Sequence, residues 1–228
     1  MAFSSIILLA GSGSSSSGGL DLVISANTTD YNALTAATAA GYDNSTGNET
    51  TVTVTINSGV NVTASGSGLT AFTTGAFNAN TTLRIINNGN IQGANGSTGS
   101  NGGNGGEGGK GIFFNTLTGG LATHSLENNG TVSGGGGGGG SGGHRRTCTP
   151  DGDGGEDCHS PTVIGGAGAV GGLGEDGQAG ENPPIQGSCD CGLQPPRGVG
   201  GAGGDSIDKN GRTVAQSGSG TYNGTQRA

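Results

Sequence analysis

The spacing of apolar residues predicts short β-strands and one helix in the first quarter of the chain. Residues 51–56 alternate threonine with valine or isoleucine, which is the period of a strand with one buried face. Leu20 to Ser25 forms a second predicted strand. Between the two, Asp30 to Ala40 is rich in alanine and is followed by Gly41. This pattern predicts a short helix with Asp30 as its N-cap and the glycine as its stop.

A looser pattern joins an apolar residue, an Asn-rich turn containing a glycine, and a second apolar residue. It occurs at 56–60, 86–91 and 126–132. Asn-Gly corners of this kind separate the short strands of stacked β-solenoid rungs, and they equally fit ordinary hairpin turns. The second and third copies lead directly into glycine-rich segments, so we expect each of these strands to begin one such segment.

From residue 93 onward the apolar pattern gives way to glycine at every third position. A period of three is that of an extended left-handed helix, in which every third residue lies on the same edge. An unbroken glycine run, 134–140, lies between the first two frames. The predicted structural glycines are Gly93, Gly96, Gly99, Gly102, Gly105, Gly108, Gly111, Gly165, Gly168, Gly171, Gly174, Gly177, Gly180, Gly198, Gly201 and Gly204.

The positions of proline favour a hydrogen-bonded bundle over collagen or a flexible linker. All six prolines lie between the glycine segments, as expected if every backbone N–H within them must donate. Polyglycine-II helices have no internal hydrogen bonds, so neighbouring rods bond to one another, and only glycine lets them come close. The alternative, a disordered Gly/Ser tract, does not account for a frame kept over six or seven repeats.

Composition limits the size of any apolar core. Hydrophobic residues make up 29% of the 228 residues, and Trp is absent. We therefore expect a mainly β or irregular fold, with a β-rich, possibly solenoid-like, attachment domain containing one short helix, followed by a polyglycine-II bundle with long connecting loops. The expected divisions are a docking segment and linker at 1–19, the β-rich domain at 20–92, the polyglycine-II domain at 93–204 and a tail at 205–228.

Charge and hydropathy exclude several classes of partner. The net charge of −8, with eight Lys and Arg residues, argues against a nucleic-acid surface. The apolar stretch from Phe3 to Ala10 is too short to span a bilayer, and we expect it to dock on another protein. The sequence predicts no transmembrane segment and no membrane insertion.

The four cysteines lie in the last two connections between glycine segments. They are Cys148, Cys158, Cys189 and Cys191. Four cysteines allow three disulfide arrangements. The near-adjacent cysteines 189 and 191 favour disulfides across the two loops, to Cys148 and Cys158. Free thiols and a metal site with His144 or His159 are the alternatives, but the spacing lacks Cys-x2-Cys turns.

Other candidate chemistry is weak. The acidic run from Asp151 to Asp157 lacks the fifth-position acid and the distant Glu of an EF-hand loop, so we interpret it as a solvated loop tip. The GxGxxG strings follow from the glycine content. No catalytic constellation stands on a credible scaffold, so we expect a protein that is not an enzyme and uses no cofactor or metal.

The segment 86–106 and the Asn-Asn-Gly-Thr-Val-Ser run that ends at residue 133 resemble the glycine-rich adhesins of bacteriophage tail fibres. The resemblance covers roughly 83–204. It implies a receptor-recognition protein at the distal tip of a tail or tail fibre in the virion. In that family polyglycine-II rods form a sandwich, and loops between them contact a host outer-membrane protein or surface glycan.

The resemblance also assigns roles along this chain. It implies that residues 1–82 attach to a tail-fibre or tail-tip protein of the same virion. The candidate receptor-binding residues are His144, Arg145, Arg146, Asp151, Asp153 and His159 in one connection, and Asp190 and Arg197 in the next. Two alternative functions are a structural virion part without receptor binding and a glycine-rich ice-binding protein. The connections of about 17–22 residues favour the adhesin, because long ordered loops are usually functional.

Overall fold

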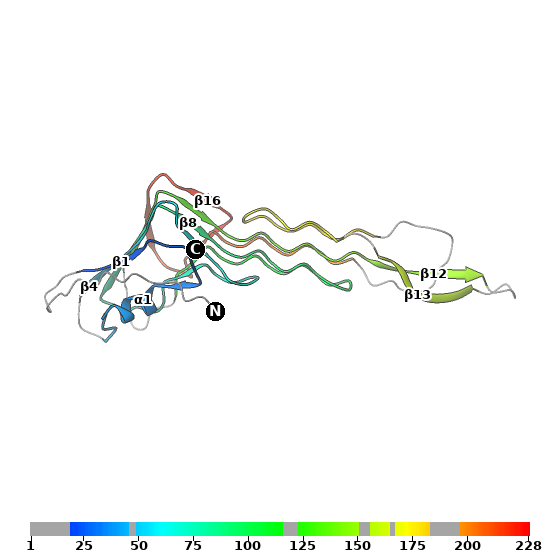
Figure 1. The fold of residues 1–228 in the computed structure, drawn as a ribbon, viewed down its shortest axis with the longest axis horizontal. Helices are drawn as coiled ribbons and strands as arrows, with labels where there is room; N and C mark the ends of the chain where they lie inside the picture. Colours follow the sequence, from blue (N-terminus) through cyan, green and yellow to red (C-terminus); the bar gives the residue numbers. More distant parts are fainter. Residues whose placement is uncertain (1–18, 46–48, 116–122, 151–155, 165–166, 183–196) are drawn as a thin grey trace.

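The structure is a computed structural model that describes residues 19–45, 49–115, 123–150, 156–164, 167–182 and 197–228. It is elongated, with strands gathered at one end, parallel extended segments in the middle and a β-hairpin at the other end (Figure 1). One helix, α1, lies at the strand-rich end. The prediction of a mainly β fold with one short helix is confirmed.

Three parallel sheets of five strands each build the strand-rich end. The chain visits the sheets in the same order five times, so each pass adds one strand to each sheet. The first sheet contains β1 (Leu20–Ile24), β4 (Thr50–Ile56), β7 (Thr81–Asn87), β10 (Thr123–Asn128) and β15 (Val214–Ser217). The second contains β2 (Thr28–Thr29), β5 (Asn61–Thr63), β8 (Asn90–Gln92), β11 (Thr131–Ser133) and β16 (Thr221–Asn223). The third contains β3 (Tyr31–Asn32), β6 (Phe72–Thr73), β9 (Ile112–Phe113), β14 (Ile207–Asp208) and β17 (Gln226–Arg227).

The alternating pattern that predicts β4 also builds the core. Val52, Val54 and Ile56 are fully buried, while the threonines between them are half-buried or exposed. The parallel register sets Val54 opposite Ile85, and Ile85 opposite Leu126 in the next strand. Identical faces therefore stack from one pass to the next, and each added strand buries another layer of apolar side chains.

The three Asn-Gly corners connect strands of different sheets. The chain turns at these corners from β4 to β5, from β7 to β8 and from β10 to β11, and each strand pairs in parallel with its counterpart in the next pass. The hairpin interpretation of these corners is therefore wrong. Asn87 and Asn128 are fully buried, and the Asn87 side-chain amide donates to Asn128 Oδ1 at 2.8 Å. Stacked asparagines thus satisfy one another inside the corner.

Helix α1 (Ala33–Ala39) begins later than the sequence predicts. Asn32 is its N-cap, with Oδ1 accepting a hydrogen bond from the N–H of Thr35 at 3.0 Å. The predicted cap, Asp30, has a left-handed φ of 50° and precedes the short strand β3, so it cannot start the helix. The glycine stop is confirmed, since Gly41 follows the helix with a φ of 94°.

The residues of the predicted C-terminal tail, 205–228, lie within the sheets. They supply β14 and the entire fifth pass, β15 to β17. Their strands are short and carry polar residues on their outer faces, so apolar periodicity does not reveal them. The predicted docking segment, 1–19, lies outside the described residues except for Gly19.

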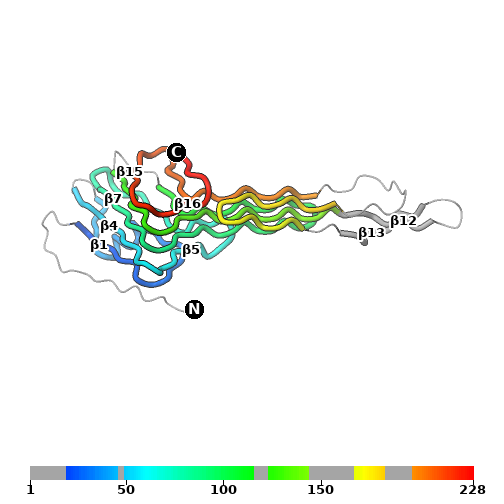
Figure 2. Tube along the Cα trace, turned by 90° about the horizontal axis from the view of Figure 1, so that it is seen from above, coloured from blue at the N-terminus to red at the C-terminus, as the bar shows by residue number. Residues whose placement is uncertain are grey.

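Two insertions between strands form the extended middle of the molecule. The first leaves the second sheet after β8 and returns to the third sheet at β9; the second leaves after β11 and returns at β14. Together they make six extended glycine-rich segments, here called rods (Figure 2). Rod 1 is 93–99, rod 2 is 103–111, rod 3 is 134–143, rod 4 is 167–172, rod 5 is 175–182 and rod 6 is 197–205.

Candidate functional site

Rod 3 lies at the centre of the rods and is bonded to the other five. Its N–H groups change direction from residue to residue, so that Gly137 donates to Glu175 O of rod 5 and Gly138 donates to Gly106 O of rod 2, both at 2.8 Å. Its carbonyl oxygens serve three further rods: they accept from Gly96 of rod 1, Gly171 of rod 4 and Gly201 of rod 6.

The surrounding rods are also bonded to one another. Backbone hydrogen bonds join rod 1 to rod 2, rod 2 to rod 6, rod 6 to rod 5 and rod 5 to rod 4. Among the described residues no hydrogen bond closes the ring between rods 4 and 1. Five rods therefore surround rod 3, and no rod of the described residues occupies the sixth position, between rods 4 and 1.

The central place of rod 3 accounts for its unbroken glycine run. A Cβ atom added at Gly135, Gly136 or Gly137 would lie 1.9–2.0 Å from a carbonyl oxygen of rod 1, rod 4 or rod 6, respectively. Because such separations are far inside van der Waals contact, no side chain fits on any edge of this rod. The run is thus a requirement of packing on all sides.

Each outer rod needs glycine along one edge, which is the origin of the three-residue period, and rod 6 needs it along a second edge too, because a Cβ added at Gly200 would lie 1.9 Å from Gly177 O of rod 5. At Gly96, Gly105 and Gly201 an added Cβ would lie 1.8–1.9 Å from backbone oxygen of a neighbouring rod, whereas Ala202, one position on, is exposed. The same steric limit applies at nearly all of the predicted structural glycines. The exceptions are Gly102 and Gly174, which have positive φ values of 80° and 70° in turns, and Gly165, which lies outside the described residues.

Side-chain oxygens replace missing neighbours at the surface of the rods. Asn95 Oδ1 accepts from the N–H of Gly136 at 2.9 Å, Asn104 Oδ1 from that of Val199 at 3.0 Å, and Asp176 Oδ1 from that of Gly203 at 2.8 Å. Asparagine and aspartate therefore complete the backbone hydrogen bonding on sides where a rod has no neighbouring rod to accept from it.

Two ion pairs mark the place where the rods leave the sheets. Lys110 Nζ lies 2.6 Å from Asp208 Oδ2, and Arg227 Nε lies 3.2 Å from Asp205 Oδ2. Burial raises the pKa of Asp205, against the opposing effect of Arg227. Burial would also raise the pKa of Asp208, but the hydrogen bonds from Lys110 and from the N–H of Asn210 outweigh it and lower that pKa.

An antiparallel hairpin forms the end of the molecule opposite the sheets (Figure 1). Its strands are β12 (His144–Pro150), which continues rod 3, and β13 (Glu156–Ile164). The candidates His144, Arg145 and Arg146 lie in β12, and His159 lies in β13. Asp151, Asp153 and Asp190 lie outside the described residues.

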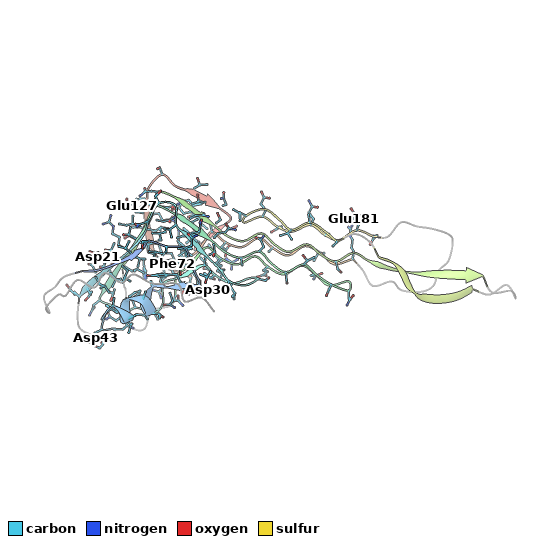
Figure 3. The ribbon with its side chains drawn as sticks, viewed as in Figure 1. Asp21, Asp30, Asp43, Phe72, Glu127 and Glu181 are labelled. Carbon is cyan, nitrogen blue, oxygen red and sulfur yellow. The ribbon has the colours of Figure 1, made fainter. Side chains whose placement is uncertain are left out.

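The remaining candidate, Arg197, is exposed at the far end of rod 6. The neighbouring Gly198 accepts from the N–H of Gly180 in rod 5 at 2.9 Å, which brings Arg197 to the level of Glu181. Glu181 is exposed where the rods meet the hairpin (Figure 3). Glu181 is not among the residues predicted from the sequence. Only the hydrogen bonds between rods 5 and 6 place it at the same end of the bundle as Arg197.

The structure adds two observations on the candidate chemistry. The register of the hairpin sets Cys148 opposite Cys158, while Cys189 and Cys191 lie outside the described residues. Within the described ranges no three His, Cys, Asp or Glu residues are grouped so that they could hold a metal ion.

No helix in the described part of the chain is long and apolar enough to cross a bilayer.

The fold defines a class of elongated β-proteins in which a glycine-rich bundle separates a hairpin from a sheet-rich base (Figure 1). The family model of the phage tail fibre adhesin Gp38 matches residues 20–227. Because the match spans most of the chain, this protein belongs to the Gp38 family of phage tail fibre adhesins. The predicted resemblance to such adhesins is thereby confirmed, as is a place in the virion on the tail fibre.

The chain is also similar to a solved structure, the crystal structure of the gp37–gp38 adhesin tip complex of the bacteriophage S16 long tail fibre. The identity is 18%, the match covers 91% of this chain and 82% of the other, and the TM-score is 0.47. A search of curated proteins finds no match. Family membership shows a phage adhesin that acts in host attachment and favours a binding role over an enzymatic one.

Proposed function

We propose that this adhesin recognises a host outer-membrane protein or surface glycan through the end formed by the hairpin and the tips of rods 5 and 6. The single observation that carries the proposal is the separation of the two ends: the sheets lie at one end and the charged hairpin at the other (Figure 1). A rigid bundle between them would hold the hairpin clear of the fibre, where it meets the cell surface first.

The sheet-rich end is the proposed attachment site for a tail-fibre protein of the same virion. Among the described residues, strands β1 to β7 and β14 to β17 meet at this end. We therefore propose an attachment region that unites the predicted domain 20–92 with the predicted tail. In this arrangement the predicted polyglycine segment 93–204 is divided between two insertions, 93–111 and 134–206, and strands β9 to β11 between them belong to the attachment region.

The conformations of the two parts support this division. The three-residue repeat of the hydrogen bonds and the steric limit to glycine favour polyglycine-II helices for the rods. Three parallel sheets built in five identical passes favour a short β-solenoid for the base. Hydrogen bonds between the rods stiffen the bundle, and a core of stacked apolar side chains stabilises the sheet-rich base.

Binding of the purified protein to candidate Gram-negative cells tests the proposal. The intact chain is compared with a version in which 145–160 and 186–194 are replaced by Gly-Ser. We expect binding by the intact chain and loss of binding by the variant, while circular dichroism of the two remains alike. Equal binding by both would place recognition elsewhere on the molecule.

A charge-reversal variant distinguishes the loss of specific charged contacts from the loss of the hairpin's structure. Arg145→Glu with Arg146→Glu is expected to weaken cell binding at least tenfold, whereas Lys209→Glu at the sheet-rich end leaves it unchanged. Absence of binding by every form on hosts that the source virus infects would favour a structural virion part. The family assignment already favours an adhesin over an ice-binding protein.

A further inference from the structure

We infer that Cys148 and Cys158 form a disulfide bond that closes the distal hairpin. The strand register sets the two residues directly opposite each other in the antiparallel pair β12–β13. Opposite residues of such a pair have Cα atoms about 4.5 or 5.5 Å apart. Both separations lie within the span of about 4.4–6.8 Å that a disulfide bridges, so the backbone need not move.

The register selects one of the three arrangements that four cysteines allow. The arrangement that joins Cys148 to Cys158 leaves Cys189 and Cys191 to each other or as free thiols. The other two join each hairpin cysteine to residue 189 or 191, and each would separate a pair that the hairpin already brings together. The bond proposed here therefore lies within one hairpin, in place of the pairing across loops that the sequence favours.

The bond would stabilise a hairpin whose register is irregular. The pairing of β12 with β13 shifts between Arg145 and Arg146, and again between Arg146 and Cys148. The sequence of β12, His-Arg-Arg-Thr-Cys-Thr-Pro, has no alternating apolar residues, so its pattern specifies the register only weakly. A covalent link beyond both shifts holds the two strands in one alignment. This inference does not depend on what the hairpin binds.

The chemistry is a two-electron oxidation. The thiols of Cys148 and Cys158 lose two protons and two electrons to form one S–S bond. A low-molecular-weight disulfide such as oxidised glutathione accepts the electrons by thiol–disulfide exchange and is reduced to two thiols. Because the cytoplasm keeps thiols reduced, the bond is expected to form after the protein leaves the cell.

Peptide mapping of the full chain tests the pairing directly. The protein is exposed to oxidised glutathione, free thiols are blocked with iodoacetamide, and trypsin and Asp-N are applied together. Cleavage after Arg146 and Arg197 and before each aspartate puts every cysteine in a separate peptide: 147–150, 157–175, 176–189 and 190–197. We expect peptide 147–150 joined to 157–175. Its recovery joined to either of the other two, or as the alkylated free peptide, would overturn the inference.

Two double variants check that the pairing is intrinsic to the hairpin. In the variant Cys189→Ser with Cys191→Ser we expect both remaining cysteines in the peptide pair 147–150 and 157–175, neither alkylated nor joined to glutathione. In contrast, Cys148→Ser with Cys189→Ser leaves one cysteine in each segment, and both are expected in the monomer as alkylated or glutathione-linked peptides that are not joined to each other. Free thiols in the first variant, or an intramolecular disulfide in the second, would contradict the proposed pairing.

Discussion

At the scale of single residues, the glycines in a repeat mark the edges of a rod that lie against the backbone of another rod. Rod 3 has neighbours on every edge and is glycine from 134 to 140, rod 6 has glycine on two edges, and rod 1 has glycine on one edge only. An added methyl group would strike backbone oxygen of another rod, and backbone cannot move aside as a flexible side chain can. Steric contact between neighbouring rods thus determines which positions must be glycine.

Substitution of a central glycine should therefore be severe. In Gly137→Ala the added Cβ would lie 1.9 Å from Gly201 O, and we expect a loss of about 3 kcal/mol or more of unfolding free energy. The matched control is Ala202→Ser on the exposed edge of rod 6, expected to change stability by less than about 0.5 kcal/mol. Chemical denaturation followed by circular dichroism measures both. Similar stabilities would show that the rods do not pack as described.

A second residue-scale prediction concerns a donor that lacks an acceptor. The N–H of Gly139 lies one repeat beyond that of Gly136, and no acceptor bonds to it within the described part of the chain. Thr98 stands one repeat beyond Asn95, on the same edge of rod 1. Thr98→Asn should supply the missing acceptor and raise stability by about 1 kcal/mol.

Two comparisons check this effect by thermal unfolding. Ser97→Asn, on a different edge of rod 1, should give no gain. Asn95→Ala removes the acceptor of Gly136 N–H and should lower stability by about 1 kcal/mol. A gain in Ser97→Asn as large as in Thr98→Asn would mean that the effect does not come from the proposed hydrogen bond.

At the scale of elements, the junction between rods and sheets depends on charged groups. The lowered pKa of Asp208 means that the fold favours its ionised form. The resulting stabilisation is present above the ordinary pKa of aspartate and is lost as the pH falls through the lowered value. Asp205 acts in the opposite direction, because its raised pKa means that burial of its charge costs stability at neutral pH.

Asp208→Asn should therefore destabilise the protein in a pH-dependent way. We expect a loss of about 1–2 kcal/mol near neutral pH, since the hydrogen bond from Lys110 loses its charged acceptor, and a loss that diminishes steadily as the pH falls below the ordinary pKa of aspartate. Asp205→Asn is the matched variant and should cost little at neutral pH or increase stability. Melting temperatures across this pH range measure both; a pH-independent loss in Asp208→Asn would contradict the assignment.

At the scale of the whole molecule, the last residues of the chain complete sheets that the first residues begin. Strands β15, β16 and β17 pair with β10, β11 and β14, and the N–H of Gly134 at the start of rod 3 donates to Asn223 O at 2.9 Å. The chain therefore returns from the distal hairpin to close its own base, and each of the two insertions that form the rods begins and ends in the sheets.

Deletion of 213–228 should for this reason affect the entire protein. It removes the fifth pass and leaves three parallel strands with open edges. We expect a lower melting temperature, a broader transition and aggregation detectable by light scattering. Gln216→Ala, which changes an exposed side chain of β15 and leaves its backbone in place, should behave like the intact protein. A truncated chain with unchanged unfolding would show that 213–228 is a dispensable tail.

The sequence alone determined the elements whose signal is local. Alternation predicted β1 and β4, and the glycine frame predicted which residues face inward in the rods, because a strand or an extended helix imposes its own period on its residues. Helix α1 was predicted by composition, but its N-cap was displaced by two residues, because the left-handed φ of Asp30 and the pairing of β3 depend on neighbouring passes.

Only the tertiary structure decided how these elements are joined. Strands of two to four residues, such as β9 and β14 to β17, are too short to carry a period, and they form because a preceding pass offers them a partner. The order of rods around rod 3, and the meeting of Glu181 with the end of rod 6 that carries Arg197, depend on hydrogen bonds between residues far apart in the chain. Local residue patterns predict which edge of a strand or rod is buried. Which other segment covers that edge is decided only when the chain folds, because the two segments lie far apart in the sequence.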